Sequence, residues 1–123
     1  AVAEFLSTHP AVASVNYAGL ETDRYYRLAR KYAPKGAGAV FTFSLKGGYD
    51  AGVSLVSNLK LFSHLANVGD TRSLVIHPAS TTHSQLDDAA KVKSGAAPDV
   101  VRLSIGIEDK DDLIADLQQA LTA

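Results

Sequence analysis

The sequence contains no cysteine, no methionine and no tryptophan. The absence of cysteine excludes disulfide bonds and thiolate metal sites, and it agrees with the reducing cytoplasm, where we expect the protein to act. Net charge is almost absent too, since 12 Lys and Arg residues face 13 Asp and Glu residues, a formal charge of -1 at pH 7. This balance predicts no nucleic-acid partner and no attraction to an anionic membrane.

Long hydrophobic runs are missing as well, and no stretch has the pattern of a membrane span or a signal peptide. What remains is an ordinary globular composition, 46% hydrophobic and 20% charged, in 123 residues. This length suits one hydrophobic core, and no linker or repeat divides it, so we expect a single domain over residues 1–123. Residues 1–6 read as a helix already under way without an initiator methionine, so we expect further chain before them.

Alternation of apolar and polar residues is typical of half-buried strands. It predicts strands at residues 12–17, 39–46, 73–77 and 100–107. In the second strand Phe41, Phe43 and Leu45 share one face, which we expect to lie in the core. In the last strand Arg102 stands on the polar face, opposite the apolar residues.

Apolar residues at helical spacing predict helices at residues 1–8, 22–32, 49–66, 85–92 and 109–121. The third of these should be the longest. In the second, Thr22 is the expected N-cap, and one stripe of residues is expected to be buried: Tyr25, Leu28, Ala29 and Tyr32. In the last, Asp109 is the expected N-cap.

The order of these elements predicts the fold class. Strands and helices alternate along the chain, and short turns join them. We therefore expect an α+β fold, a two-layer sandwich in which a small, mostly antiparallel sheet carries helices on one face.

The most polar segment without a helical period is residues 67–84. Hydroxyls, an amide and two imidazoles are concentrated there, which is typical of a loop that presents groups to a ligand. A metal site formed by His77, His83 and Asp70 is disfavoured, because the spacing fits no familiar zinc pattern. We therefore assign no metal ligand, and His77 is interpreted as a residue packed beneath the loop.

Two segments carry a family resemblance: FSHLANVGDTRSLVIHPASTTHSQL at residues 62–86 and VRLSIGIEDKDDLIADLQQAL at residues 101–121. They resemble the carboxy-terminal domain of the Cys/Met-metabolism enzymes that depend on pyridoxal phosphate (PLP), most closely the O-acetylhomoserine sulfhydrylase branch. VNYAGL and KYAPKGAGAVFTFSLKGG extend the resemblance over nearly the whole chain. It implies the carboxy-terminal domain of a fold-type I transferase, whose PLP-binding lysine belongs to an upstream domain that this sequence lacks.

The resemblance implies a function for the complete enzyme, in which PLP is the cofactor and sulfide replaces the acetate of O-acetyl-homoserine to give homocysteine. The alternatives are a relative of cystathionine γ-synthase or methionine γ-lyase, or a free-standing α+β binding module without catalysis. A homo-oligomer, dimer or tetramer, is also implied for the complete enzyme. This chain alone is expected to bind no cofactor and to be inactive.

The resemblance also implies substrate-binding residues, namely Arg102, Asn67 and Thr82, and no catalytic residue. Arg102 matches the position that binds the substrate α-carboxylate, for which a guanidinium offers two parallel donors; alternation alone would make it a solvated strand residue. Asn67 matches a serine near that carboxylate, or it ends the long helix. Thr82 matches a threonine of the pocket, or its hydroxyl bonds to nearby backbone.

Overall fold

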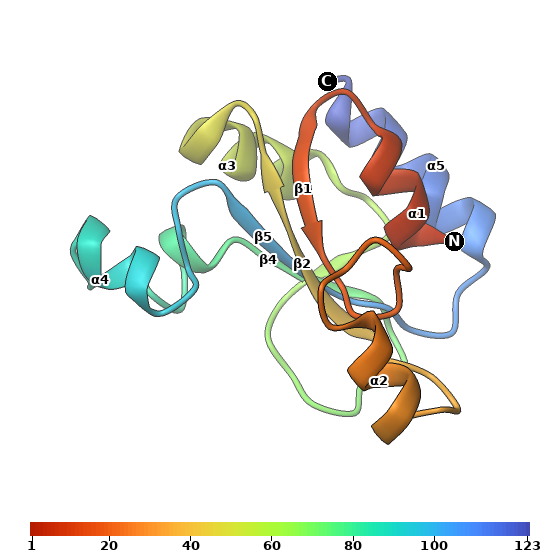
Figure 1. Cartoon of the computed structure of the whole chain (residues 1–123). Coiled ribbons are helices and arrows are strands. Elements are labelled where there is room, and N and C mark those ends of the chain that lie inside the picture. The colour runs from red at the N-terminus through yellow and green to blue at the C-terminus, as the bar shows by residue number, and fades with distance from the viewer.

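A computed structural model describes residues 1–123, and its strands form one five-stranded sheet in the order β1-β2-β5-β4-β3 (Figure 1). Among the first four strands in this order, each neighbouring pair is antiparallel: β1 (Val12–Asn16), β2 (Val40–Leu45), β5 (Val100–Ser104) and β4 (Leu74–Ile76). Only the two-residue strand β3 (Ser63–His64) runs parallel to its neighbour β4. The predicted sheet, small and mostly antiparallel, is confirmed.

Three helices pack on one face of this sheet, namely α1 (Val2–Thr8), α3 (Gly48–Asn58) and α5 (Lys110–Leu121). The short helices α2 (Tyr26–Tyr32) and α4 (Asp88–Lys93) lie away from this layer (Figure 1). A 3-10 turn, Pro78–Ser80, follows β4. The sheet and its layer of helices form the predicted two-layer α+β sandwich. The helices contain no stretch with the length and hydropathy of a membrane span.

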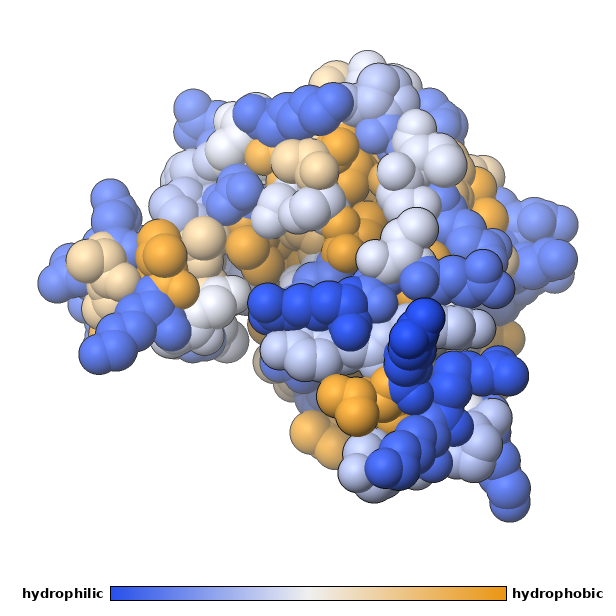
Figure 2. Space-filling view, viewed as in Figure 1, coloured by the Kyte–Doolittle hydropathy of each residue, from blue (hydrophilic) through white to orange (hydrophobic).

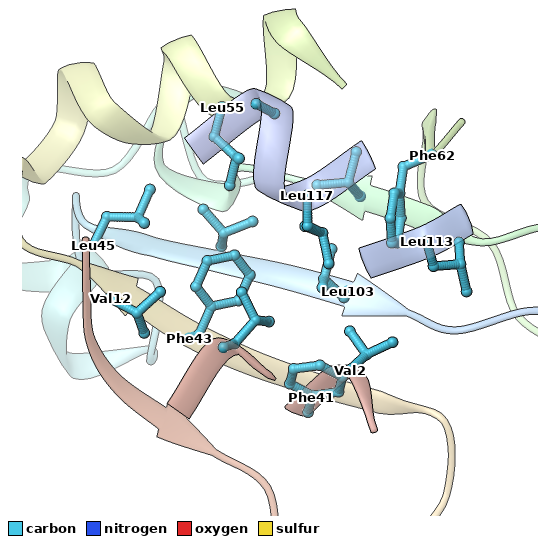
Figure 3. Close-up of a cluster of buried hydrophobic side chains, with 14 of the residues drawn as sticks. Val2, Val12, Phe41, Phe43, Leu45, Leu55, Phe62, Leu103, Leu113 and Leu117 are labelled. Carbon is cyan, nitrogen blue, oxygen red and sulfur yellow. The ribbon is translucent and has the colours of Figure 1, made fainter. Parts of the chain in front are cut away.

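The core lies between the sheet and this helical layer (Figure 3). Strand β2 contributes Phe41, Phe43 and Leu45, each at most 5% exposed, as its alternation predicted. Strand β5 contributes Val101 and Leu103, which are fully buried. The facing helices supply Val2, Leu6, Leu55, Leu113 and Leu117. Because Val101 and Leu103 point into the core, Arg102 between them must point to the opposite face.

Helix α3 is shorter than predicted, since it ends at Asn58 and not near residue 66. The carboxylate of Asp116, on α5, accepts hydrogen bonds from the backbone N–H groups of Lys60, Leu61 and Phe62 at 2.7–3.3 Å. These N–H groups point to a carboxylate and not to carbonyls one helical turn earlier, so the helix stops. The longest helix is consequently α5, with 12 residues, and not α3, with 11.

The expectations for α2 were wrong in two respects. Its N-cap is Tyr25 and not Thr22, and no side chain caps it. It contains no buried residue, and of the stripe expected to be buried Tyr25, Leu28 and Tyr32 are 47%, 50% and 74% exposed, while Ala29 is half-buried. The spacing identified an apolar face correctly, but no other element of this chain covers that face.

Candidate functional site

Arg102 lies in the middle of β5, between Thr42 of β2 and Ile76 of β4 in the register of the sheet. Its side chain is half-buried on the face opposite the core. The three ion pairs of the structure all involve other residues, and no hydrogen bond within the chain uses the guanidinium. A positive charge held on a strand without a partner carboxylate is suited to an anionic ligand, above all to a carboxylate.

Asn67 and Arg102 line the same small pocket, although they are distant in the sequence. The other lining residues are mostly apolar: Leu65, Ala66, Leu74, Val75, Ile76 and Ser104. The structure thus brings two of the three predicted site residues together. No lysine lines this pocket, whereas PLP enzymes hold their cofactor through one. The pocket therefore offers no group that would hold PLP, and its volume of about 10 Å³ is that of about one water molecule.

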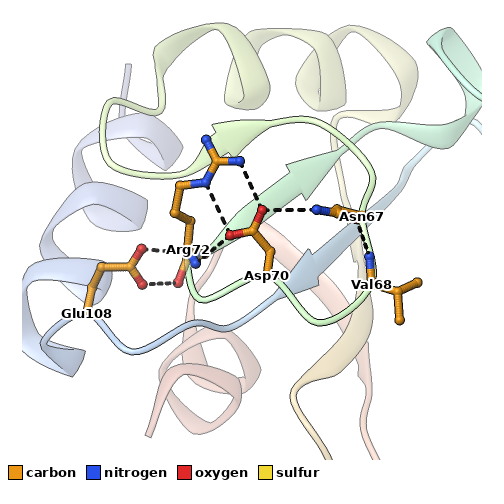
Figure 4. Close-up of polar contacts among 6 residues, drawn as sticks. Asn67, Val68, Asp70, Arg72 and Glu108 are labelled. Carbon is orange, nitrogen blue, oxygen red and sulfur yellow. Dashed lines mark hydrogen bonds and ion pairs between the residues drawn. The ribbon is translucent and has the colours of Figure 1, made fainter.

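The amide of Asn67 is held by its own loop. Its Nδ2 donates to Oδ2 of Asp70 at 3.2 Å, and its Oδ1 accepts from the backbone N–H of Val68 at 2.8 Å (Figure 4). The interpretation of Asn67 as the end of the long helix was wrong, because α3 ends at Asn58. Asn67 instead belongs to the loop between β3 and β4, which contributes it to the pocket beside Arg102.

Asp70 and Arg72 form a bidentate ion pair in this loop (Figure 4). Arg72 donates from Nη2 to Oδ2 at 2.9 Å, from Nε to Oδ1 at 3.2 Å and from its backbone N–H to Oδ1 at 2.9 Å. These bonds, helped by Asn67, hold the pKa of Asp70 far below its usual value, and they raise the pKa of Arg72. The Asp70 carboxylate is therefore charged, and its charge is compensated by Arg72.

Glu108 attaches the loop to the chain that follows β5. Its carboxylate accepts the backbone N–H and the hydroxyl of Ser73, both at 2.7 Å, and Oγ of Ser73 accepts the N–H of Gly106 at 2.8 Å. Burial acts to raise the pKa of Glu108, but the two hydrogen bonds from Ser73 outweigh it, so the pKa is lowered. A Cβ at Gly106 would collide with the carbonyl oxygen of Thr71. The loop and the end of β5 therefore form one closely packed unit.

The sequence reasoning missed these supporting residues. Asp70 carried a usable signal, because an Asp next to Gly69 in a turn often accepts the N–H two residues later, as it does here from Arg72. Glu108 carried none, since its partner Ser73 lies 35 residues earlier.

Thr82 lies outside the pocket that Asn67 and Arg102 share. Its side chain is exposed, and its hydroxyl makes a hydrogen bond with Nδ1 of the adjacent His83 at 2.8 Å. The structure of this chain therefore does not group Thr82 with the other two residues, and its contribution to substrate binding stays a prediction.

His77 is packed beneath the loop, as interpreted from the sequence. It is fully buried, and both ring nitrogens have partners: Nδ1 meets the hydroxyl of Ser80 at 2.8 Å and Nε2 meets the carbonyl of Pro98 at 2.6 Å. Gly52 of α3 lies against this ring, with no room for a Cβ. These contacts give His77 a structural role.

Comparison with known proteins gives several matches over nearly the entire chain. A family model described as Cys/Met metabolism PLP-dependent enzyme matches residues 1–122. O-acetyl-L-homoserine sulfhydrylase 1 of Thermus thermophilus is 53% identical over 98% of this chain, and the O-acetyl-L-homoserine sulfhydrylase of Corynebacterium glutamicum is 50% identical over 99% of it. L-methionine gamma-lyase of Fusobacterium nucleatum is 46% identical over 98% of the chain. The chain spans only 28%, 28% and 30% of the lengths of these relatives.

A solved structure matches equally well. The crystal structure of a protein assigned as an O-acetylhomoserine (thiol)-lyase from Campylobacter jejuni superposes with a TM-score of 0.90 at 44% identity. The match covers 99% of this chain and 29% of that one, which contains a pyridoxyl-lysine monophosphate residue.

Proposed function

The chain belongs to the Cys/Met metabolism PLP-dependent enzyme family, and we propose that it is the carboxy-terminal substrate-recognition domain of an O-acetylhomoserine sulfhydrylase. The choice of enzyme is supported by sulfhydrylase relatives at 50–53% identity, against 46% for the methionine gamma-lyase. The observation that carries the proposal is Arg102, a half-buried arginine that no carboxylate of its own chain neutralises.

The complete enzyme would exchange the acetate of O-acetyl-homoserine for sulfide and so produce homocysteine. PLP, held by a domain outside this chain, would supply the electron sink that such chemistry at an amino acid needs. The residues of this chain would bind and orient the substrate. Arg102 would hold the α-carboxylate through two parallel N–H groups, and Asn67 would add a third donor. Thr82 would line the wall of the pocket that the remaining domain completes.

The rest of the protein is part of the same proposal. Since the relatives are more than three times as long as this chain, we propose that the missing part contains the PLP-binding domain and its lysine. The complete enzyme would be a cytoplasmic homo-oligomer that uses sulfide or a thiol as its second substrate. A free-standing binding module would leave Arg102 and Asn67 as half a site, with nothing opposite them.

The test is to replace Arg102 by Ala and by Lys in the full-length enzyme. Removing one partner of a desolvated charged pair costs about 2–5 kcal/mol, which corresponds to about 30-fold or more in kcat/KM for O-acetyl-homoserine. The KM for sulfide should stay unchanged, because sulfide has no carboxylate. Lys should restore only part of the loss, since an ammonium lacks the planar pair of donors.

Arg27→Ala is the matched control, because Arg27 is an exposed arginine of α2 that makes no ion pair. It should leave both KM values unchanged. An Arg102→Ala enzyme with a normal KM for the amino acid would overturn the assignment.

Methionine γ-lyase activity is the second candidate, and it rests on the 46% identity to the Fusobacterium enzyme over 98% of the chain. Arg102 would serve this reaction equally, because L-methionine has the same α-carboxylate. Assays of the full-length enzyme with O-acetyl-homoserine plus sulfide, and separately with L-methionine, distinguish the two candidates by which substrate is consumed.

A further inference from the structure

The amide of Asn67 has a defined orientation. An amide oxygen can only accept hydrogen bonds and an amide nitrogen can only donate them. The carboxylate of Asp70 only accepts, so it requires the nitrogen of Asn67 on its side, where Nδ2 lies at 3.2 Å. The backbone N–H of Val68 only donates, so it requires the oxygen on its side, at 2.8 Å. Turning the amide over would place two acceptors against each other and two donors against each other.

This orientation leaves one hydrogen of Nδ2 without an acceptor in the chain. Asn67 lines the same pocket as Arg102, whose guanidinium is also without an acceptor. The lining of one small pocket therefore includes two residues from different elements, each with a donor that has no acceptor in the chain. A carboxylate, which accepts from several directions, satisfies both.

Asp70 has a negative charge, and an unbalanced charge in this loop would oppose an anionic ligand. Arg72 binds both carboxylate oxygens, at 2.9 and 3.2 Å, and so compensates that charge. The loop therefore combines the amide orientation that Asp70 enforces with a local charge close to zero.

We propose that Asp70 is a positioning residue for the amino-acid substrate, which acts by orienting the Asn67 amide so that this side chain offers an N–H to the α-carboxylate beside Arg102. This inference rests on the proposed function. It adds a residue that does not touch the substrate and that affects substrate binding only through Asn67.

The experiment is a double-mutant cycle in the full-length enzyme, with Asp70→Asn, Asn67→Ala and the combination of the two. The carboxamide of Asp70→Asn keeps the shape of the side chain but no longer determines which end of the Asn67 amide faces it. We expect a rise of about 5- to 10-fold in the KM for O-acetyl-homoserine, the equivalent of about one hydrogen bond. The KM for sulfide should stay unchanged. Asn67→Ala should raise the same KM by at least as much.

The decisive result is the effect of Asp70→Asn in the Asn67→Ala background, where a residue that acts only through Asn67 has nothing left to orient. We expect no further rise in KM there, since the positive charge that Asp70→Asn leaves on Arg72 attracts the substrate carboxylate and does not oppose it. A purely structural role would persist in both backgrounds. Thr71→Ala is the control, because Thr71 is exposed in the same loop and its side chain has no hydrogen bond.

Several outcomes would overturn the inference alone, provided that Arg102→Ala raises the amino-acid KM. They are a normal KM in Asp70→Asn, an undiminished effect of Asp70→Asn in the Asn67→Ala background, and a normal KM in Asn67→Ala. A normal KM in Asn67→Ala would overturn the inference even if the Asp70→Asn enzyme fails to fold. A normal KM in Arg102→Ala would instead overturn the proposed function.

Discussion

At the scale of single residues, Asp116 shows how one side chain determines where an element ends. It is 7% exposed, and its carboxylate accepts from three consecutive backbone N–H groups and from Nε2 of Gln119 at 3.0 Å. Burial acts to raise its pKa, but these hydrogen bonds stabilise the charged form more and so lower the pKa. The charged carboxylate of Asp116 therefore connects α5 to the segment that follows α3.

Asp116→Ala should lower the free energy of unfolding by about 2–3 kcal/mol, because leaving buried donors without an acceptor costs about 1–3 kcal/mol. Urea unfolding measures this change. Gln118→Ala, at an exposed position of the same helix, should change the stability by less than about 0.5 kcal/mol. A loss no larger than that of the control would contradict the role of Asp116 at the end of α3.

The lowered pKa of Asp116 also predicts a pH dependence of this stabilisation. The stabilisation is present above the pKa of the unfolded chain, about 3.9, and is lost as the pH falls through the lower pKa of the folded state. Unfolding curves between pH 6 and pH 2 should therefore converge for wild type and Asp116→Ala as the medium becomes acidic.

At the scale of elements, α2 is a helix that has apolar residues but buries none of them. Its stripe of Tyr25, Leu28 and Tyr32 is exposed. Much of the surface in the region of α2 is strongly hydrophilic (Figure 2). Cations lie over its rings, with Arg24 at 4.7 Å from the centroid of Tyr25 and Lys31 at 5.1 Å from that of Tyr32. These contacts are local to the helix and do not attach it to the sheet.

Amide hydrogens of α2 should therefore exchange with solvent much faster than those of α5, which buries Leu113 and Leu117. Protection follows burial and local contact density, both of which are low in α2. Hydrogen–deuterium exchange of this chain measures the difference, and equal protection of both helices would contradict it. In the full-length enzyme, the protection of α2 reports whether the remaining chain covers it.

At the scale of the whole molecule, the two faces of the sheet have different tasks. One face is covered by α1, α3 and α5 and contains the core. The other carries Arg102, and beside it the loop between β3 and β4 contributes Asn67. The chain spans less than a third of the length of its relatives. Under the proposed function, the surfaces that the chain itself leaves open are the ones that the rest of the protein would contact.

The 123-residue chain by itself should self-associate through its exposed apolar stripe on α2. Sedimentation velocity over a range of concentrations should detect this association, and Leu28→Lys should weaken it by placing a charge in the stripe. Val92→Lys is the control, because Val92 is 60% exposed on α4, away from the stripe. A monodisperse monomer at high concentration would contradict the prediction.

Much of the sheet could be predicted because its signals are local. The alternation of Phe41, Phe43 and Leu45 identified the buried face of β2, and the same period placed Arg102 on the open face of β5. Where the prediction was wrong, a non-local contact was responsible or was missing. Asp116, 56 residues away from Lys60, ends α3, and no element of this chain packs on the stripe of α2.

The sequence by itself determined the fold class and the family, because periodicity and motif spacing relate residues close together in the chain, and it predicted Arg102 and Asn67 as substrate-binding residues. Only the tertiary structure decided that these donors share a pocket, that Asp70 orients one of them, and that Glu108 attaches their loop to the end of β5. Such contacts depend on which distant segments of the sequence lie together in the fold, and no local sequence pattern encodes this.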